Sequence, residues 1–166
     1  MKIYHYTSVI KWLCIQNKGL HVSEEHGRKM LHPLTNDFKG AIWAFPEAAP
    51  QSWIDNISTT EFNLTCLFGH CAAGDTLTLL ELDIPDDADL WATDWAYGYK
   101  DAETGWRSVD YFEALRRYEG KDHLAGFRLP EVICFDNIAP ERIRQIDIPE
   151  NVRPHVRPID LMTPPY

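Results

Sequence analysis

The chain has 166 residues, of which 45% are hydrophobic and 25% are charged, and its formal net charge is −9. This length predicts one domain that can bury an ordinary core without disulfides, and the acidic balance disfavours non-specific binding to nucleic acid. No run approaches the roughly 18 apolar residues of a membrane span, and residues 1–20 lack the pattern of a signal peptide, so we expect a cytoplasmic protein with reduced thiols and no membrane contact.

The chain begins with a predicted strand and helix. Residues 2–7 alternate in the manner of a strand, and Ser8 suits the N-cap of a helix that continues to Asn17. Gly19 follows as a stop signal. The buried face of this helix is predicted to carry Val9, Ile10, Leu13 and Cys14.

A polar, irregular stretch at 23–39 predicts a mobile loop. A short strand is expected at 40–45. Pro46 then suits the first position of a helix that extends to Ile54, and residues 55–73 give no clear pattern.

The second half predicts further strands and one amphipathic helix. The helix is expected over 108–118, with Ser108 as its cap and Gly120 as its stop. Strands are expected at 77–84, 128–135 and 142–148, with a short extended piece at 90–91 and a short helix near 94–99.

This mixture of short strands and peripheral helices, without sustained β-α-β alternation, predicts an α+β fold. Residues 1–152 are expected to form a single domain. Residues 153–166 contain four prolines and are expected to run extended over the surface as a tail.

The cysteines and histidines of the loops have ordinary explanations. Cys66, His70 and Cys71 are soft metal ligands, but their spacing is looser than in usual zinc sites and no second pair lies nearby. We therefore expect no metal site. The other cysteines, Cys14 and Cys134, are predicted to be reduced core residues, and the histidines at 21, 26 and 32 to be solvated loop residues.

Several common nucleotide-binding, catalytic and calcium-binding motifs are absent from the sequence. It contains no glycine-rich dinucleotide or phosphate loop and no nucleophile elbow. Four acidic residues after the strand at 77–84 lack the alternating oxygens and the turn glycine of a calcium loop, so a solvated turn is expected; they are Asp83, Asp86, Asp87 and Asp89.

Two titratable residues lie within predicted strands. Glu131 opens the apolar run 131–135, and carboxylates avoid apolar strands unless they are paired or have a function. His5 lies in the middle of the first strand. Each also has a structural interpretation, His5 as a core histidine bound to a carbonyl and Glu131 as a solvated edge carboxylate.

Three segments, in order, resemble motifs of the ADP-ribosyltransferase superfamily. Ile3-Tyr4-His5-Tyr6-Thr7 resembles the first-strand motif of the histidine class, and Asn17-Lys18-Gly19-Leu20 resembles the turn after the following helix. Gly40-Ala41-Ile42-Trp43, with Ser52-Trp53 downstream, resembles the second motif. Glu131-Val132-Ile133-Cys134-Phe135, followed by Ile138-Ala139-Pro140-Glu141-Arg142-Ile143, resembles the third. The matched stretches cover about a third of the chain, and the likeness is greatest to the bacterial and phage toxin-like branch.

The resemblance implies split mixed or antiparallel sheets with peripheral helices around a central NAD cleft. It implies that Glu131 is catalytic and that NAD, as substrate, is held by residues of the first and second motifs. The sequence departs from the family at Trp43, which replaces a tyrosine, and at Tyr6, which replaces a glycine. The implied NAD-binding residues are His5, Tyr6, Thr7, Trp43, Ser52 and Trp53.

The implied function is that of a mono-ADP-ribosyltransferase, which cleaves the nicotinamide–ribose bond and transfers ADP-ribose to a macromolecular acceptor. NAD hydrolysis, with water as the acceptor, is an alternative, and so is a non-catalytic binding or immunity protein on the same scaffold. A tRNA 2′-phosphotransferase-like activity is disfavoured because the acidic chain lacks a basic surface. The acceptor, protein or nucleic acid, is left open.

Overall fold

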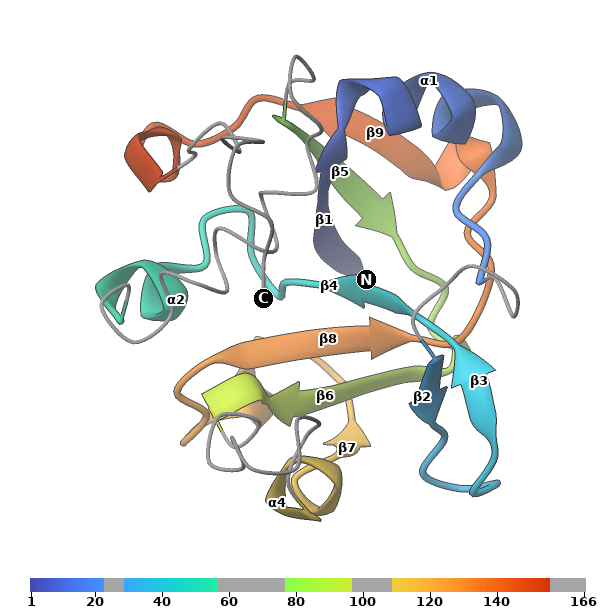
Figure 1. Cartoon of the computed structure of the whole chain (residues 1–166), viewed down its shortest axis with the longest axis vertical. Helices are drawn as coiled ribbons and strands as arrows, with labels where there is room; N and C mark the ends of the chain where they lie inside the picture. Colours follow the sequence, from blue (N-terminus) through green and yellow to red (C-terminus); the bar gives the residue numbers. More distant parts are fainter. Residues whose placement is uncertain (23–28, 57–76, 97–108, 156–166) are drawn as a thin grey trace, which may run out of the picture.

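The computed structural model describes residues 1–22, 29–56, 77–96 and 109–155. Within this part of the chain the fold is α+β, as predicted, and is built on two antiparallel sheets (Figure 1). The first sheet has the order β1-β5-β9 and the second β4-β8-β6-β7. The strands are β1 Lys2–Ser8, β4 Ile42–Ala44, β5 Leu77–Asp83, β6 Leu90–Asp94, β7 Arg116–Arg117, β8 Pro130–Cys134 and β9 Ile143–Ile146.

Strand β1 leads directly into helix α1, Val9–Lys18, as the sequence predicts. The Ser8 hydroxyl accepts the backbone N–H of Lys11 at 3.2 Å, which caps the helix. Gly19 ends it with a φ of 81°, and a Cβ at that position would lie 2.3 Å from the carbonyl oxygen of Ile138. Only glycine therefore allows the chain to pass this close to the turn after β8.

The buried face of α1 differs from the predicted one. Ile15 is buried and Trp12 packs against the core, whereas Ile10 and Leu13 are 62% and 56% exposed. The helix carries two apolar stripes, and the stripe containing Trp12 and Ile15 is the one that faces the fold. The prediction that Cys14 is a core residue was consequently wrong, since this thiol is exposed; Cys134 is buried, as predicted.

A β-hairpin lies where the sequence predicted a mobile loop. Strand β2, Lys29–Leu31, pairs antiparallel with β3, Phe38–Gly40. The turn between them is closed by backbone hydrogen bonds from His32 N–H to the Asp37 carbonyl and from Asn36 N–H to the His32 carbonyl. The strands are too short to give a clear alternating pattern in the sequence.

Two predicted helices are shorter than expected. Helix α2 covers only Gln51–Asp55, because Pro50 lies directly before it and lacks the N–H that a continuing helix would use. Helix α4 covers Val109–Glu113 and is followed by β7, which pairs with Trp91 and Ala92 of β6. The predicted short helix near 94–99 and the ambiguous stretch 55–73 lie largely outside the described residues, as does most of the predicted tail.

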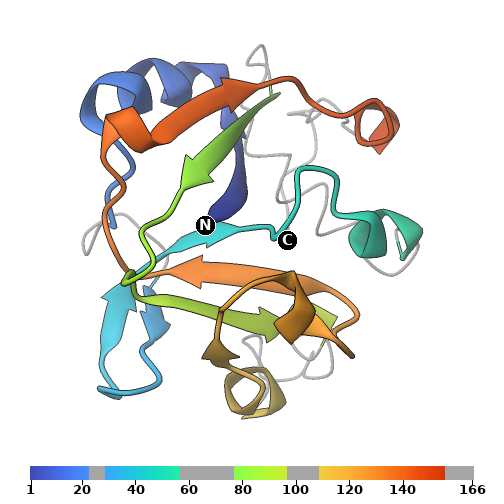
Figure 2. The same cartoon turned by 180° about the vertical axis from the view of Figure 1, so that it is seen from behind.

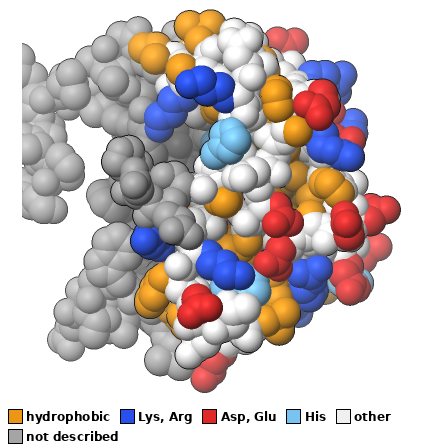
Figure 3. All heavy atoms as spheres, turned by 90° about the vertical axis from the view of Figure 1, so that its right-hand side faces the viewer, with side chains coloured by type: hydrophobic (Ala, Val, Ile, Leu, Met, Phe, Trp, Pro, Cys, Tyr) orange, Lys and Arg blue, Asp and Glu red, His pale blue; other side chains and the backbone are white. Residues whose placement is uncertain are grey.

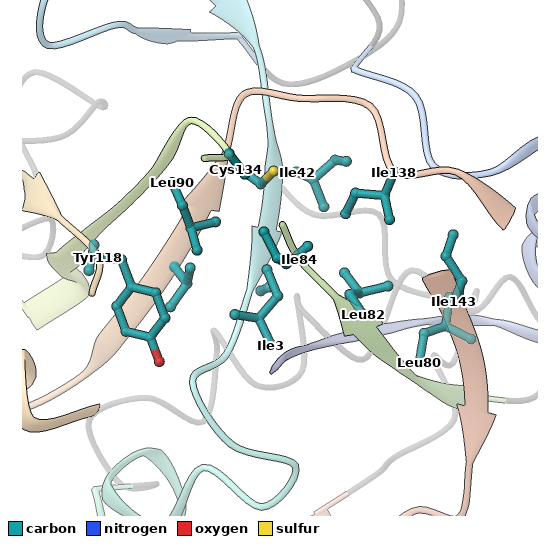
Figure 4. Close-up of a cluster of buried hydrophobic side chains, with 14 of the residues drawn as sticks. Ile3, Ile42, Leu80, Leu82, Ile84, Leu90, Tyr118, Cys134, Ile138 and Ile143 are labelled. Atoms are coloured by element: carbon teal, nitrogen blue, oxygen red, sulfur yellow. The ribbon is translucent and has the colours of Figure 1, made fainter. Parts of the chain in front are cut away.

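The main core lies between the two sheets. Figure 4 shows Leu80 and Leu82 of β5 together with Ile42 of β4 and Cys134 of β8 in one buried cluster. Viewed from behind, the first sheet and α1 lie on one side of this cluster and β8 and β6 on the other (Figure 2). Burial of these side chains is the main favourable term for holding the sheets together.

The sheets are joined where β1 meets β4. Tyr4 N–H donates to the Phe45 carbonyl at 2.9 Å, and Phe45 N–H donates to the Tyr4 carbonyl at 2.7 Å. This antiparallel bridge stands directly after the last residue of β4. It sets the position of the first sheet relative to the second.

A polar cluster ties the β2–β3 hairpin to the second sheet. His32, which is 3% exposed, contacts a carboxylate oxygen of Asp89 through Nε2 at 2.6 Å. Its Nδ1 accepts the backbone N–H of Thr35 at 3.2 Å, so Nε2 carries the proton and donates to Asp89. Trp91 Nε1 and the guanidinium of Arg117 also donate to this carboxylate.

Two predictions were therefore wrong at this cluster. His32 is a buried hydrogen-bonding residue rather than a solvated one, and Asp89 is bonded rather than part of a solvated turn. Burial acts to raise the pKa of Asp89, but the hydrogen bonds from Trp91 and His32 and the charge of Arg117 outweigh it, so the pKa is lowered.

The lowered pKa of Asp89 predicts a pH-dependent contribution to stability. Its stabilising effect is fully present above the ordinary carboxyl pKa of 3.8 and is lost as the pH falls below it. We expect Asp89→Asn to reduce the free energy of unfolding at pH 7 by about 1–3 kcal/mol. Urea unfolding of both proteins from pH 7 to pH 3 should show the difference shrinking below about pH 4; a constant difference would contradict this assignment.

Candidate functional site

Glu131 is held inside the second sheet, near the start of β8. It is 3% exposed, and it shares a face of β8 with Ile133 because alternate residues of a strand point to the same side. Tyr111 of α4 donates its hydroxyl to Glu131 Oε2 at 2.6 Å. The side chain is therefore buried and hydrogen-bonded, and the expectation of a solvated edge carboxylate does not hold.

His5 is held against strand β4. Its Nδ1 lies 2.8 Å from the carbonyl oxygen of Trp43, and because a carbonyl can only accept, Nδ1 carries the proton. Burial lowers the pKa of the ring, the bond to Trp43 opposes this, and the charge of Lys11 adds to the lowering. The ring is thus neutral at pH 7, with Nε2 as a hydrogen-bond acceptor.

Trp43 lies between these two residues. Its carbonyl binds His5, and in the β4–β8 ladder it stands opposite Ile133. Residues opposite each other in an antiparallel pair have side chains on the same face, so the Trp43 indole is on the face of the sheet that carries Glu131. It packs there against the buried cluster that contains Ile133 and Tyr111.

The register of the strands brings the backbones of the two segments near each other, whereas Glu131 and Ile133 lie on the face of the second sheet opposite Val132 and Cys134, which pack in the core between the sheets. Ala44 stands opposite Val132, so continuing the register by one residue brings Phe45 level with Glu131. Phe45 is also the residue that bridges to Tyr4. The two distant segments therefore lie on either side of β4, with their backbones about 10 Å apart at the spacing of neighbouring strands.

Tyr6 and Thr7 are buried along β1. The Tyr6 hydroxyl donates to the carbonyl of Ala48 at 2.5 Å, and burial raises the pKa of this phenol. Since alternate residues of an antiparallel strand direct their N–H and C=O groups to the same edge, the main chain of Tyr6 points to the edge at which Tyr4 meets β4. Thr7 points its main chain the other way, toward β5.

Helix α2 places Ser52 and Trp53 differently. Trp53 is fully buried, packs edge-on against Phe45, and donates its indole N–H to the carbonyl of Pro130 at 3.0 Å. It therefore supports the residue before Glu131, and contact with a nicotinamide ring would require it to become exposed. Ser52 is half-buried beside it, and its carbonyl accepts from Asn56; the roles predicted for both residues stay predictions.

Tyr111 and Asp94 are site residues that the sequence did not indicate. Tyr111 is fully buried, but nothing in its helix marks it as a partner of a glutamate 20 positions later. Asp94 is 1% exposed, and its carboxylate accepts the backbone N–H groups of Ala96, Arg128 and Leu129 at 2.8–3.0 Å. Its place at the end of an apolar strand was the signal that could have found it.

A hollow of about 380 Å³ lies at the opposite end of β8 from Glu131. It is lined by apolar residues together with Asp87, Asp136, Asn137 and Arg142. The side of the molecule that Figure 3 shows carries acidic and basic side chains interspersed with hydrophobic ones. No single charge dominates the described part of this face, which does not suggest a phosphate-binding surface.

Comparison of the chain with protein-family models, with curated proteins and with solved structures gives no match. Among the described residues, no group of three or more histidine, cysteine, aspartate or glutamate side chains is arranged to hold a metal ion. The same residues include no helix with the length and apolar character needed to cross a membrane. Cys66, His70 and Cys71 lie outside the described residues.

The three bonds of Asp94 predict a large effect on the segment before Glu131. We expect Asp94→Ala to reduce the free energy of unfolding by on the order of 3 kcal/mol, because buried N–H groups lose a charged acceptor. Asp122→Ala, at an exposed position, is the matched control and should change it by less than about 0.5 kcal/mol. Equal midpoints in urea for the two variants would show that Asp94 does not fix this segment.

Proposed function

We propose that the protein is an NAD-dependent mono-ADP-ribosyltransferase with Glu131 as its catalytic residue. The observation that carries the proposal is the convergence of the three motif segments on strand β4. His5 binds the carbonyl of Trp43, Trp43 pairs with the strand of Glu131, and the β1–β4 bridge stands level with Glu131. Segments more than 120 positions apart are thereby brought to one end of the second sheet.

The state of His5 suits recognition of a ribose. Because Nδ1–H is engaged by Trp43, the neutral ring offers Nε2 as an acceptor for a hydroxyl group. By resemblance this hydroxyl belongs to the adenosine ribose of NAD. The main chain of Tyr6, on the β4 side of β1, would hold the nicotinamide amide, and the Trp43 indole would stack on the nicotinamide ring.

The proposed reaction needs one carboxylate. The bond between the ribose C1′ and the nicotinamide nitrogen breaks, and its electron pair neutralises the pyridinium, so no general acid is required. Positive charge develops on the ribose, and an anionic Glu131 stabilises charge that is largest in the transition state. The acceptor then forms the new bond to C1′ and loses a proton to Glu131 or to water.

The burial of Glu131 favours a second candidate, a non-catalytic binding protein. A carboxylate that is 3% exposed and bound by Tyr111 also has the surroundings of a structural residue. Incubation with NAD labelled in its ADP-ribose part separates the candidates. Label on a macromolecule supports transfer, free labelled ADP-ribose supports hydrolysis, and intact NAD supports the binding protein.

Removing the charge of Glu131 should abolish NAD cleavage with little change in fold. We expect Glu131→Gln to lower kcat by at least about 10²-fold, because the amide keeps the size but not the charge that opposes the oxocarbenium ion. Glu141→Gln, at an exposed position of the turn η3, Pro140–Arg142, is the control and should retain full turnover. A folded Glu131→Gln protein with undiminished turnover would reject the assignment.

The indole of Trp43 should contribute to NAD affinity. Stacking on a cationic ring is worth about 1–2 kcal/mol, so Trp43→Ala should raise the Kd for NAD roughly five- to thirtyfold. Trp43→Phe keeps an aromatic face and should bind more tightly than the alanine variant. Calorimetric titration of the three proteins tests this, and equal affinities would exclude a stacking role.

A further inference from the structure

We propose that Tyr111 is a positioning residue for Glu131, anchored in turn by Thr93. The inference rests on the proposed function of Glu131 and extends it to a residue of helix α4. It concerns how the carboxylate is held on the sheet, and it follows from the hydrogen bonds that join three neighbouring positions.

The bond between Tyr111 and Glu131 is short and closed off from solvent. The hydroxyl lies 2.6 Å from Oε2, within the range of O–H donors to ionised carboxylates. Tyr111 is fully buried, and its ring packs edge-on against Phe112. A donor held this firmly restricts the rotation of the carboxylate and stabilises its charged form.

Thr93 links this pair back to the sheet. Its hydroxyl, also fully buried, donates to the main-chain carbonyl of Tyr111 at 2.7 Å. In the ladder between β6 and β8, Thr93 stands directly opposite Glu131. The sheet, the helix and the carboxylate therefore form a closed ring of contacts, in which the position of the Tyr111 hydroxyl is set from the strand that neighbours its acceptor.

The arrangement meets two requirements of the proposed reaction. Electrostatic stabilisation of a transition state depends on a carboxylate that stays charged and keeps its direction before substrate arrives. A misplacement of about 1 Å can cost on the order of 10²-fold in rate. Tyr111 supplies both requirements without needing contact with NAD, so its loss should reduce kcat far more than it changes KM.

Tyr111→Phe tests the inference, because it removes one oxygen and keeps the ring. We expect kcat for NAD cleavage to fall about ten- to hundredfold with KM within about twofold. The acidic limb of the pH–rate profile should move to higher pH, since the carboxylate loses a donor that favours its charged form. Tyr118→Phe, a buried tyrosine of the main core, is the matched control and should leave turnover and the profile unchanged.

The anchor is tested with two variants of Thr93. Thr93→Ser keeps the hydroxyl and should retain most turnover, whereas Thr93→Val keeps the shape, lacks the donor and should lower kcat in the same direction as Tyr111→Phe. Thermal melts identify any variant that fails to fold. Carbon-13 NMR titration of the Glu131 carboxyl gives a readout besides activity, and its midpoint should be higher in Tyr111→Phe than in the parent protein.

The outcomes separate the two proposals. If the parent protein leaves NAD intact, the proposed function fails, and with it the catalytic use of Tyr111. If the parent protein cleaves NAD but Tyr111→Phe shows the same kcat, pH profile and carboxyl titration, the positioning role alone is rejected. The positioning role is supported if Tyr111→Phe has a reduced kcat and a shifted pH–rate profile. It is supported further if Thr93→Ser retains the turnover of the parent protein and Thr93→Val does not.

Discussion

The bridge between Tyr4 and Phe45 is the constraint on which the arrangement of the molecule depends. Two backbone hydrogen bonds join the N-terminal strand to the end of β4, and β4 pairs with the strand of Glu131. Each sheet could form its own ladders without this contact. The bridge and the apolar cluster between the sheets (Figure 4) determine how the sheets stand relative to each other, and so where His5 lies with respect to Glu131.

Polar side chains then refine the positions that the bridge sets. Asp94 holds the backbone before Glu131 by three N–H groups, and Trp53 holds the carbonyl of Pro130. Tyr111 holds the carboxylate itself. The start of β8 is thus restrained from three elements, which is the kind of support that a residue with a precise chemical task requires. The same contacts would also stabilise a purely structural strand, so activity assays decide between the two.

Local patterns in the sequence predicted the strands at 2–7, 77–84 and 128–135, and the cap and stop of α1, because those features depend on residues close together in the chain. Tertiary contacts decided the rest. The prediction of the buried face of α1 was wrong because both stripes of this helix are apolar. Strand β7 was not predicted because two residues are too few to show an alternating pattern. The bonds of His32 with Asp89 and of Tyr111 with Glu131 join residues 57 and 20 positions apart, and no local rule pairs them.

A crystal structure with a non-cleavable NAD analogue would show whether His5 and Glu131 bind one molecule. We expect His5 Nε2 to lie about 3 Å from a hydroxyl of the adenosine ribose, and a carboxylate oxygen of Glu131 to lie about 3 Å from the nicotinamide ribose of the same bound molecule. An analogue bound away from both side chains, or no binding at saturating concentration, would contradict the proposed NAD site and leave His5 and Glu131 as structural residues of the two sheets.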